Sequence, residues 1–352
     1  MASGHAQWIS STLHTTQPSA SAKAITSSQV TSAPNSVKAV ASIGRDCTPR
    51  AAALLPDNRR MKKPSAPLPA CSTARRYSAP ISPAERREFV PFMHLLIGAA
   101  FDVIRPLFLR GVTVSAKADA TPVTEADRGA EAAMRRRIEH RYPQHGIVGE
   151  EFGEKAGRRY RWILDPVDGT RAFITHCFLF GTLIALERDD GAGFAPILGA
   201  IAHPAAGLAL VGHRDGTRLY SADGSEREAR VRPCHRIEDA TVLATTHWET
   251  GEQRGGEGAA ALIRRARLYR TWGDCFGYFA LATGGADVML DPTLAYWDVA
   301  ALVPVVEGAG GCLSSWSGGD PLAELSLIAT AGPLHDEVLR QVGTPRRDAP
   351  TA

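Results

Sequence analysis

Apolar residues recur every three or four positions along a segment that begins at Pro83 and ends near Gly111. The apolar positions are Phe89, Phe92, Met93, Leu96, Ile97, Ala100, Val103, Ile104 and Leu107. This spacing predicts an amphipathic helix with one face in the core. A helix start is also indicated by Ser82, which can cap the helix, and by Glu85, which completes a capping box with it.

A second helical pattern follows Thr124, which is paired with Asp127 three residues later as at the start of the first helix. One face carries the residues Ala126, Ala130, Met134 and Ile138. The arginine run at residues 135–137 is expected to be a largely solvated helix face.

Short apolar runs alternate with helical patterns over the rest of the chain. The predicted strands are residues 146–153, 161–165, 180–188, 196–203, 208–213, 240–246, 268–274, 287–292 and 326–332, and the predicted helices are 258–267, 275–285, 298–311 and a closing helix. The polar stretch after His213 is rich in turn residues and predicts no regular element. Strands mixed with helices over this length predict a layered α/β sandwich, in which helical and sheet layers alternate.

Composition divides the chain into three parts. Residues 1–83 are rich in Ser, Thr, Ala and Pro, with Asp46 and Asp57 as their only acids, which predicts a disordered leader. The same composition is typical of an organelle transit peptide. The alternatives are a start codon assigned too far upstream, or a terminal segment without any targeting signal. Residues 84–343 form the predicted catalytic domain, and 344–352 a disordered tail.

The overall charge and the cysteines exclude several classes of protein. The chain has 40 Lys and Arg residues against 37 Asp and Glu residues, a net charge of only +3, which does not indicate a surface that binds nucleic acid. No uninterrupted apolar run approaches the roughly 20 residues needed to span a membrane. The six cysteines are scattered without a C-x-x-C pair, which indicates neither a zinc site nor a disulfide framework. We therefore expect a cytoplasmic protein, or a plastid or other organelle protein if the leader is a transit peptide.

The stretch WILDPVDGTRAFI places Asp165 and Asp168 close together at the end of an apolar run. Two carboxylates this close repel each other, and one tends to take up a proton unless a cation lies between them. Hard oxygen ligands suit magnesium, and the amides of Gly169 and Thr170 at the following turn suit a phosphate. The stretch therefore offers ligands for a metal beside amides for a phosphate, as a phosphate-ester hydrolase needs, although an ordinary turn is the better interpretation of D-P-V-D-G alone.

Four ordered motifs decide between these interpretations. They are TPVTEAD at 121–127, GEEFG at 149–153, DPVDGTRAF at 165–173 and YWDVAALVPVVEGAGG at 296–311. With these motifs the chain resembles the inositol monophosphatase family of magnesium-dependent, lithium-sensitive phosphatases, from about Glu85 to the final helix. The resemblance implies that family's layered fold, a small phosphorylated substrate and a homodimer.

The resemblance also implies roles for individual residues. The implied metal ligands are Glu150, Asp165, the carbonyl of Val167, Asp168 and Asp298. Gly169 and Thr170 would hold phosphate, and Thr170 and Glu150 would orient the attacking water. Asp127 would support a more weakly held outer metal through water. The family uses two or three magnesium ions and displaces the leaving group in line, without a phosphoenzyme.

Taken alone, each of these residues has a simpler interpretation. Asp298 could cap the helix that begins there, and Asp127 could cap an earlier one. Glu151 could be a solvated neighbour of Glu150. The isolated residues His203 and His247 are expected to be structural or exposed rather than metal ligands.

The segment WGDCFGYFALATGGADVMLDP resembles the histidinol-phosphatase branch of the family, which implies hydrolysis of L-histidinol phosphate in histidine biosynthesis. Because that substrate carries a cation, its pocket should include an acid near the leaving group. Asp291, seven residues before Asp298, stands where the family places such a carboxylate, and Asp274 would assist it. Cys275 is expected to pack rather than act as a nucleophile, since no histidine neighbours it.

Other functions stay open at this point. Inositol 1-phosphate, a nucleotide 3'-phosphate or another small ester could be the substrate, and a catalytically inactive relative could bind a ligand through the same cleft. The chain also departs from the family at His176-Cys177-Phe178, where a small Gly-containing loop leading to a proline is expected. We expect this loop to border the substrate and to affect specificity or rate.

Overall fold

The computed structural model describes residues 76–110, 113–116, 122–247 and 256–343, all of which belong to one unit of the chain. The predicted leader up to residue 75 and the predicted tail 344–352 lie outside the described residues. The described chain begins before the predicted boundary at residue 83, because Tyr77 and Ser78 donate backbone hydrogen bonds to the Glu307 carboxylate at 2.6 and 3.3 Å. Residues 76–82 therefore belong to the folded part.

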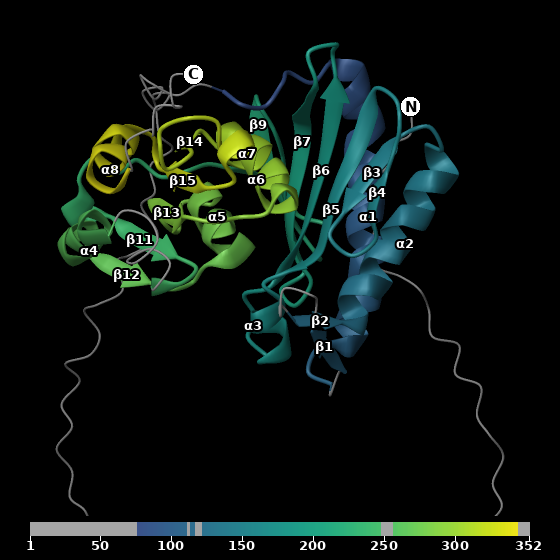
Figure 1. The fold of residues 1–352 in the computed structure, drawn as a ribbon, viewed down its shortest axis with the longest axis horizontal. Coiled ribbons are helices and arrows are strands. Elements are labelled where there is room, and N and C mark those ends of the chain that lie inside the picture. Colours follow the sequence, from purple (N-terminus) through teal and green to yellow (C-terminus); the bar gives the residue numbers. More distant parts are fainter. Residues whose placement is uncertain (1–75, 111–112, 117–121, 248–255, 344–352) are drawn as a thin grey trace, which may run out of the picture. The chain divides into compact units, whose positions relative to one another are not determined.

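Two large sheets form the centre of the described fold (Figure 1). The eight-stranded sheet has the order β10 (Glu226–Ala229), β9 (Gly216–Ser221), β8 (Leu208–His213), β7 (Phe194–His203), β6 (Gly181–Asp189), β5 (Tyr160–Asp168), β3 (Gly146–Gly149) and β4 (Gly153–Lys155). Its strands pair antiparallel except for β3 and β5. The five-stranded sheet has the order β12 (Leu268–Arg270), β11 (Thr241–Ala244), β13 (Val288–Asp291), β15 (Leu327–Thr330) and β14 (Cys312–Ser314). A further pair joins β1 (Val114–Ala116) and β2 (Pro122–Thr124).

Helices cover both sheets. They are α1 (Pro83–Leu107), α2 (Glu125–Arg141), α3 (Thr170–Ile174), α4 (Gly256–Arg265), α5 (Asp274–Ala282), α6 (Tyr296–Gly308), α7 (Pro321–Glu324) and α8 (His335–Val342). α1 and α2 pack together on one face of the larger sheet, α6 packs on its other face and against β14, and α5 packs against α6 and the smaller sheet. Helical and sheet layers thus alternate, as predicted.

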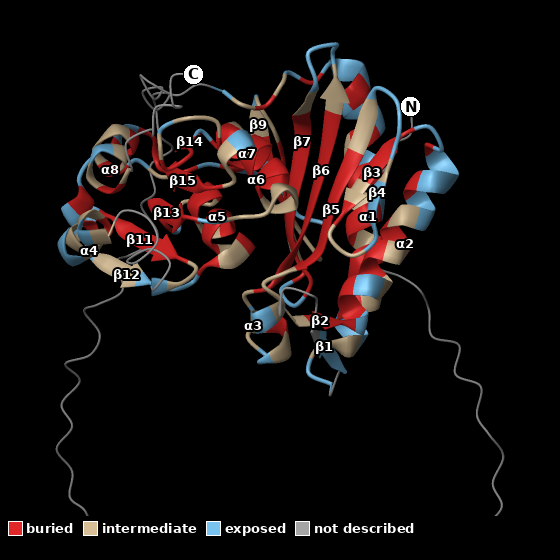
Figure 2. Cartoon of the chain, in the orientation of Figure 1, coloured by how far each residue is buried: buried red, intermediate tan, exposed pale blue. Residues whose placement is uncertain are grey.

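The apolar run of β6 is buried on both faces of the sheet, as the red strands of Figure 2 show. Leu183 and Ala185 join the hydrophobic cluster on the α6 side, whereas Ile184 and Leu186 join the cluster under α1 and α2. Because side chains alternate across a strand, a strand between two helical layers must be apolar at successive positions. The continuous run in the sequence is thereby explained.

The first predicted helix is confirmed with its cap. The Ser82 hydroxyl accepts from the Glu85 amide, and the Glu85 carboxylate accepts from the Ser82 amide. By length and composition this helix is apolar enough to cross a membrane. Its apolar side chains, including Met93 and Leu96 at 0% exposure, are instead buried in the core. α1 is therefore a core helix.

The structure differs from the sequence predictions at several places. The predicted strand 146–153 is divided into β3 and β4 by a turn, and Asp274, predicted as the last residue of a strand, begins α5. The polar stretch after His213 forms β9 and the edge strand β10. Three of the four residues of β10 are exposed, so this strand gives no apolar signal. The arginine run on α2 is not uniformly solvated: Arg136 and Arg137 are exposed, but the Arg135 side chain is only 13% exposed and pairs with Glu131. A buried acid one turn earlier draws Arg135 inward.

Candidate active site

Strand β5 carries the two aspartates that the sequence singled out. It runs through Pro166 to Asp168, further than predicted, and its register with β6 shifts between Asp165 and Asp168. Residues three apart on a regular strand point to opposite faces, but a bulge re-aims one of them. The irregularity allows both carboxylates to approach the same point.

Asp298 joins them from the first turn of α6. Asp165, Asp168 and Asp298 each offer a carboxylate oxygen, and these three oxygens lie within 4.8 Å of one another. Asp298 also accepts the Ala295 amide at 2.8 Å, so it caps α6 and belongs to the cluster as well. The two interpretations of Asp298 are therefore compatible.

Glu150 follows β3 and lies beside Asp165, with which it makes a side-chain hydrogen bond. Its own amide donates to the Leu164 carbonyl of β5 at 3.1 Å. The parallel pairing of β3 with β5 thus brings the GEEFG motif next to the DPVDGT motif.

The acids of the cluster hold their protons unusually tightly. Burial raises the pKa of Asp165 well above its ordinary value, and the nearby carboxylates of Glu150, Asp168 and Asp298 raise it further. Burial is the largest cause, and the nearby carboxylate of Asp298 the second largest, of a rise in the pKa of Asp168 to about 7. Burial also raises the pKa of Asp298 to about 7. Like charges in a low-dielectric site produce this pattern in the absence of a cation.

The donor set fits a hard divalent cation. The ligands are carboxylate oxygens, and Asp165 Oδ1 is buried without a hydrogen-bond partner among the described residues. An orphaned buried carboxylate oxygen is costly unless a cation or a water contacts it. Glu150, Asp165, Asp168, Asp298 and the Val167 carbonyl are the groups that could hold magnesium here.

Thr170 and Asp127 meet at the start of α3. The Thr170 hydroxyl lies 3.0 Å from the Val167 carbonyl and 3.3 Å from Asp127 Oδ1. The other Asp127 oxygen accepts from the amide and hydroxyl of Thr124, so this acid caps α2, as its simpler interpretation holds. Asp127 is 1% exposed and contacts Thr170 directly, and its support of an outer metal stays a prediction.

Gly169 occupies a position that requires glycine. Its φ of +77° lies in the left-handed region, and a Cβ there would come within 3.0 Å of Asp274 Oδ2. The chain can therefore bring the Asp274 carboxylate close to the Gly169-Thr170 backbone only because no side chain intervenes.

A cavity of about 590 Å³ contains these groups. Its lining consists of Pro122, Glu150, Asp165, Val167, Asp168, Gly169, Thr170, Arg171, Thr245, Thr246, Asp274, Ala295, Trp297 and Asp298. Thr245 and Thr246 were not predicted as site residues, although they are the last two residues of the predicted strand 240–246. In the structure they directly follow β11, at the end that faces the site. Positions after the carboxyl ends of parallel strands are where open α/β sheets place ligands, so this signal was available.

The two acids predicted to contact the leaving group differ in position. Asp274 lines the cavity, and its amide donates to the Thr245 hydroxyl at 2.9 Å. Asp291 is not among the lining residues: it is 2% exposed and accepts from the Tyr278 hydroxyl at 2.8 Å and from Thr245. Burial raises the pKa of Asp291 to about 7. Asp291 therefore lies behind Thr245, and its direct contact with substrate stays a prediction.

Other residues singled out in the sequence lie off the cavity. Cys275 is 1% exposed and burial raises the pKa of its thiol well above the ordinary value, so it supplies no thiolate; its amide instead donates to Asp168 Oδ2. His176, Cys177 and Phe178 are not among the lining residues. Phe178 is 61% exposed and packs against Phe108, with ring centroids 5.3 Å apart.

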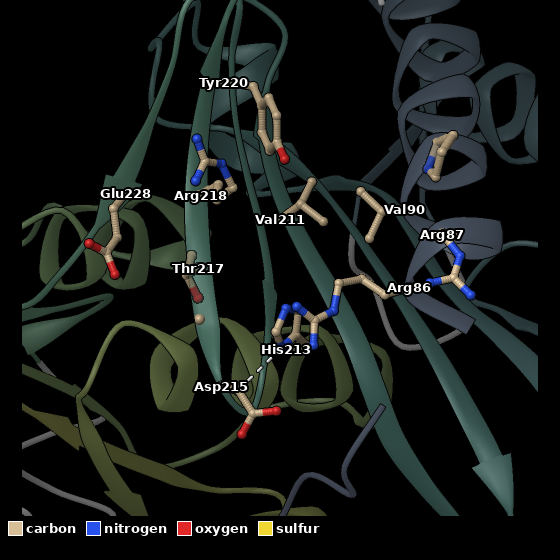
Figure 3. Close-up of a pocket in the computed structure, with 12 residues that line it drawn as sticks. Arg86, Arg87, Val90, Val211, His213, Asp215, Thr217, Arg218, Tyr220 and Glu228 are labelled. Carbon is tan, nitrogen blue, oxygen red and sulfur yellow. Dashed lines mark hydrogen bonds between the residues drawn. The ribbon is translucent and has the colours of Figure 1, made fainter. Parts of the chain in front are cut away.

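A second cavity, of about 550 Å³, lies between α1 and the strands β8 to β10 (Figure 3). Arg86 and Arg87 of α1 and Arg218 of β9 line it. Arg218 donates to Glu226, and Glu228 pairs with Arg230, so charges at this sheet edge are matched locally. None of the predicted site residues lines this cavity, and the candidate active site is the acidic one.

A cavity with clustered carboxylates beside a turn that suits phosphate, in a layered α/β fold, is typical of metal-dependent hydrolases of phosphate esters. The model of the Inositol monophosphatase family matches residues 86–344. The chain belongs to the inositol monophosphatase family, and it is a phosphatase of that family, whose members generally depend on Mg²⁺.

Individual relatives carry more than one phosphatase name. The chain is 34% identical over 241 residues to a histidinol-phosphatase of Chlorobaculum parvum, covering 68% of this chain and 90% of the relative. It is 36% identical over 256 residues to the bifunctional phosphatase IMPL2, chloroplastic, of Arabidopsis thaliana, covering 71% of each chain. A solved inositol monophosphatase from Zymomonas mobilis is 35% identical with a TM-score of 0.62, covering 73% of this chain and 98% of that one.

The raised pKa values predict how stability depends on pH. Asp168, Asp291 and Asp298 bind their protons more tightly when folded, with pKa values of about 7 against the ordinary 3.8. The stabilisation that these three groups contribute to the free energy of unfolding is therefore complete below about pH 4 and is lost as the pH rises towards 7. Without metal, we expect Tm to fall by on the order of 10 °C between pH 5 and pH 8. Calorimetry in chelator should show this slope and a smaller one in magnesium; equal slopes would contradict cation binding at the cluster.

Proposed function

We propose that the chain is a magnesium-dependent histidinol-phosphatase, which hydrolyses L-histidinol phosphate to L-histidinol and phosphate and so serves histidine biosynthesis. The observation that carries the choice of substrate is the Asp274 carboxylate, which lines the acidic cavity close to Gly169. In histidinol phosphate the ammonium group is on the carbon next to the phosphate-bearing carbon. An acid beside the phosphate-binding turn suits that arrangement. The histidinol-phosphatase relatives support the same substrate.

Glu150, Asp165, Asp168 and Asp298, with the Val167 carbonyl, would hold two or three magnesium ions. When bound, magnesium neutralises phosphate charge, lowers the pKa of water and stabilises the leaving oxygen. The repulsion that raises the pKa values of the cluster is then relieved, because a cation favours the charged carboxylates.

The protein groups would position the reactants. The Thr170 hydroxyl can donate to Val167 or Asp127, which leaves its lone pairs free to accept from the attacking water. Glu150, which lines the same cavity as Thr170, would accept a proton from that water. The amides of Gly169 and Thr170 would hold phosphate oxygens. The new bond would join the water oxygen to phosphorus, and the bond from phosphorus to the alcohol oxygen would break in line. The leaving alcohol oxygen would take up a proton from a water molecule, and Glu150 would return its proton to solvent.

A second candidate is hydrolysis of inositol 1-phosphate. It is favoured by the 35% identity with the Zymomonas mobilis inositol monophosphatase. Against it, a neutral polyol gives Asp274 no cation to pair with. Hydrolysis of other small esters, including nucleotide 3'-phosphates, would require the same metal cluster. These esters differ from histidinol phosphate and inositol 1-phosphate only in the leaving group.

The direct test is phosphate release from L-histidinol phosphate and from inositol 1-phosphate, measured in magnesium and in excess chelator. We expect turnover that chelator abolishes, with kcat/KM at least roughly tenfold higher for histidinol phosphate. A preference for inositol phosphate would keep the mechanism and overturn the substrate. No release from either ester would favour a binding-only relative.

The place of action depends on the leader. We propose the cytoplasm, with a plastid or other organelle as the alternative that the Arabidopsis thaliana relative, named chloroplastic, favours. Mass analysis of the mature amino terminus in its native cell distinguishes an intact leader from a cleaved one. A homodimer is part of the same proposal, and light scattering of the purified protein tests it.

A further inference from the structure

Glu131 is a fully buried acid that the proposed chemistry does not use. It lies on α2 at 0% exposure and does not line the acidic cavity. Its carboxylate accepts the Glu151 amide at 2.7 Å and the Phe152 amide at 3.2 Å, and Arg135 Nε donates to it at 2.7 Å. A buried carboxylate with this many donors is held firmly in place.

The two amides belong to the turn that presents Glu150. This turn joins β3 to β4, and Glu150 is its first residue. On one side the Glu150 amide is bonded to Leu164 of β5, the residue before Asp165. On the other side the next two amides are bonded to Glu131. Glu150 is therefore fixed between the strand that carries the cluster and the helix behind it.

Two further residues complete this arrangement. Arg135 also donates to the Gly153 carbonyl, so it closes the far end of the same turn. Gly149 leaves the space that Glu131 fills, because a Cβ there would lie 2.0 Å from Glu131 Oε1. Any other residue at 149 would push the carboxylate away from the turn. We call Glu131, Arg135 and Gly149 the Glu131 brace.

We propose that Glu131 is a positioning residue that holds the Glu150 carboxylate against the Asp165 cluster and thereby sets the affinity of the site for magnesium. This inference rests on the proposed metal site. Glu131 acts through the backbone, since its oxygens are occupied by two amides and by Arg135. Groups that orient metal ligands in this way typically affect metal affinity by about 10- to 100-fold.

The test is Glu131→Gln, compared with Asp287→Asn as a matched control. Glutamine keeps the size but places an NH₂ group against a donor, so one backbone amide loses its acceptor. Asp287 is also 0% exposed and bonded to an arginine, Arg232, and to the Thr241 amide, but it precedes β13 and does not line the acidic cavity. Both variants are expected to lose thermal stability.

Only Glu131→Gln should lose metal affinity. We expect its dissociation constant for Mg²⁺, measured by titration calorimetry on the full chain, to rise roughly 10- to 100-fold, and that of Asp287→Asn to stay within about twofold of wild type. Terbium luminescence sensitised by Trp297, which lines the cavity, gives an independent readout. Equal affinity in Glu131→Gln and wild type would overturn the inference.

Two further outcomes are informative. If the wild type binds no metal, the proposed function is overturned. That result differs from failure of this inference, which would appear as equal metal affinity in the wild type and the variant. If Glu131→Gln does not fold, Arg135→Gln replaces it, since it removes the donors to Glu131 and Gly153 and leaves the carboxylate. An unchanged affinity in a folded Arg135→Gln would then overturn the inference.

Discussion

Asp165→Asn is expected to lower turnover roughly a thousandfold while leaving the protein folded. Asp165 is 2% exposed, lies beside Glu150, Asp168 and Asp298, and has an oxygen without a hydrogen-bond partner among the described residues. Asparagine keeps the shape but removes one of the charges that would hold magnesium. A loss of about 4 kcal/mol of transition-state stabilisation corresponds to that factor.

The same substitution should not destabilise the metal-free protein. It removes a buried carboxyl whose pKa is raised by burial and by like charges, so repulsion within the cluster decreases. The measurements are kcat in saturating magnesium and Tm in chelator, with Asp287→Asn as the control for loss of a buried acid. Turnover within threefold of wild type would remove Asp165 from the site. A Tm well below that of wild type in chelator would show that its role is structural.

The features that the sequence predicted correctly are local or periodic. The helix starts at Ser82 and Thr124 follow from capping boxes, which need only four residues to be recognised. The buried run of β6 follows from continuous apolar character. The clustering of Asp165 and Asp168 with Asp298, which joins two distant segments, was neither local nor periodic and was expected only from the resemblance that the ordered motifs carry.

The features that the sequence did not predict depend on contacts between distant segments. Glu131 and Arg135 look like part of a polar helix face, and only the packing of α2 against the turn after β3 makes them a brace. Thr245 joins the site because β11 and β13 pair in parallel and end side by side. The relative depth of Asp274 and Asp291 is likewise set by how α5 and β13 pack.

Asp274→Asn is expected to lower kcat/KM for L-histidinol phosphate roughly thirtyfold, a change of about 2 kcal/mol, and that for inositol 1-phosphate by less than about threefold. The physical reason is the loss of the carboxylate that would pair with the ammonium group of the first substrate. Asparagine is the appropriate replacement because Asp274 has a φ of +48°, which asparagine tolerates better than most residues. Its amide can therefore keep its bond to Thr245.

Asp291→Asn is the matched comparison, because it removes the other predicted acid from behind the cavity wall. Its carboxylate already accepts from Tyr278 and Thr245, so we expect a smaller and less selective loss than for Asp274→Asn. A larger selective loss in Asp291→Asn would favour the direct contact that the resemblance implies and would make Asp274 secondary. Equal losses on both substrates in both variants would contradict an acidic contact with the leaving group, because a neutral polyol offers no cation to distinguish them.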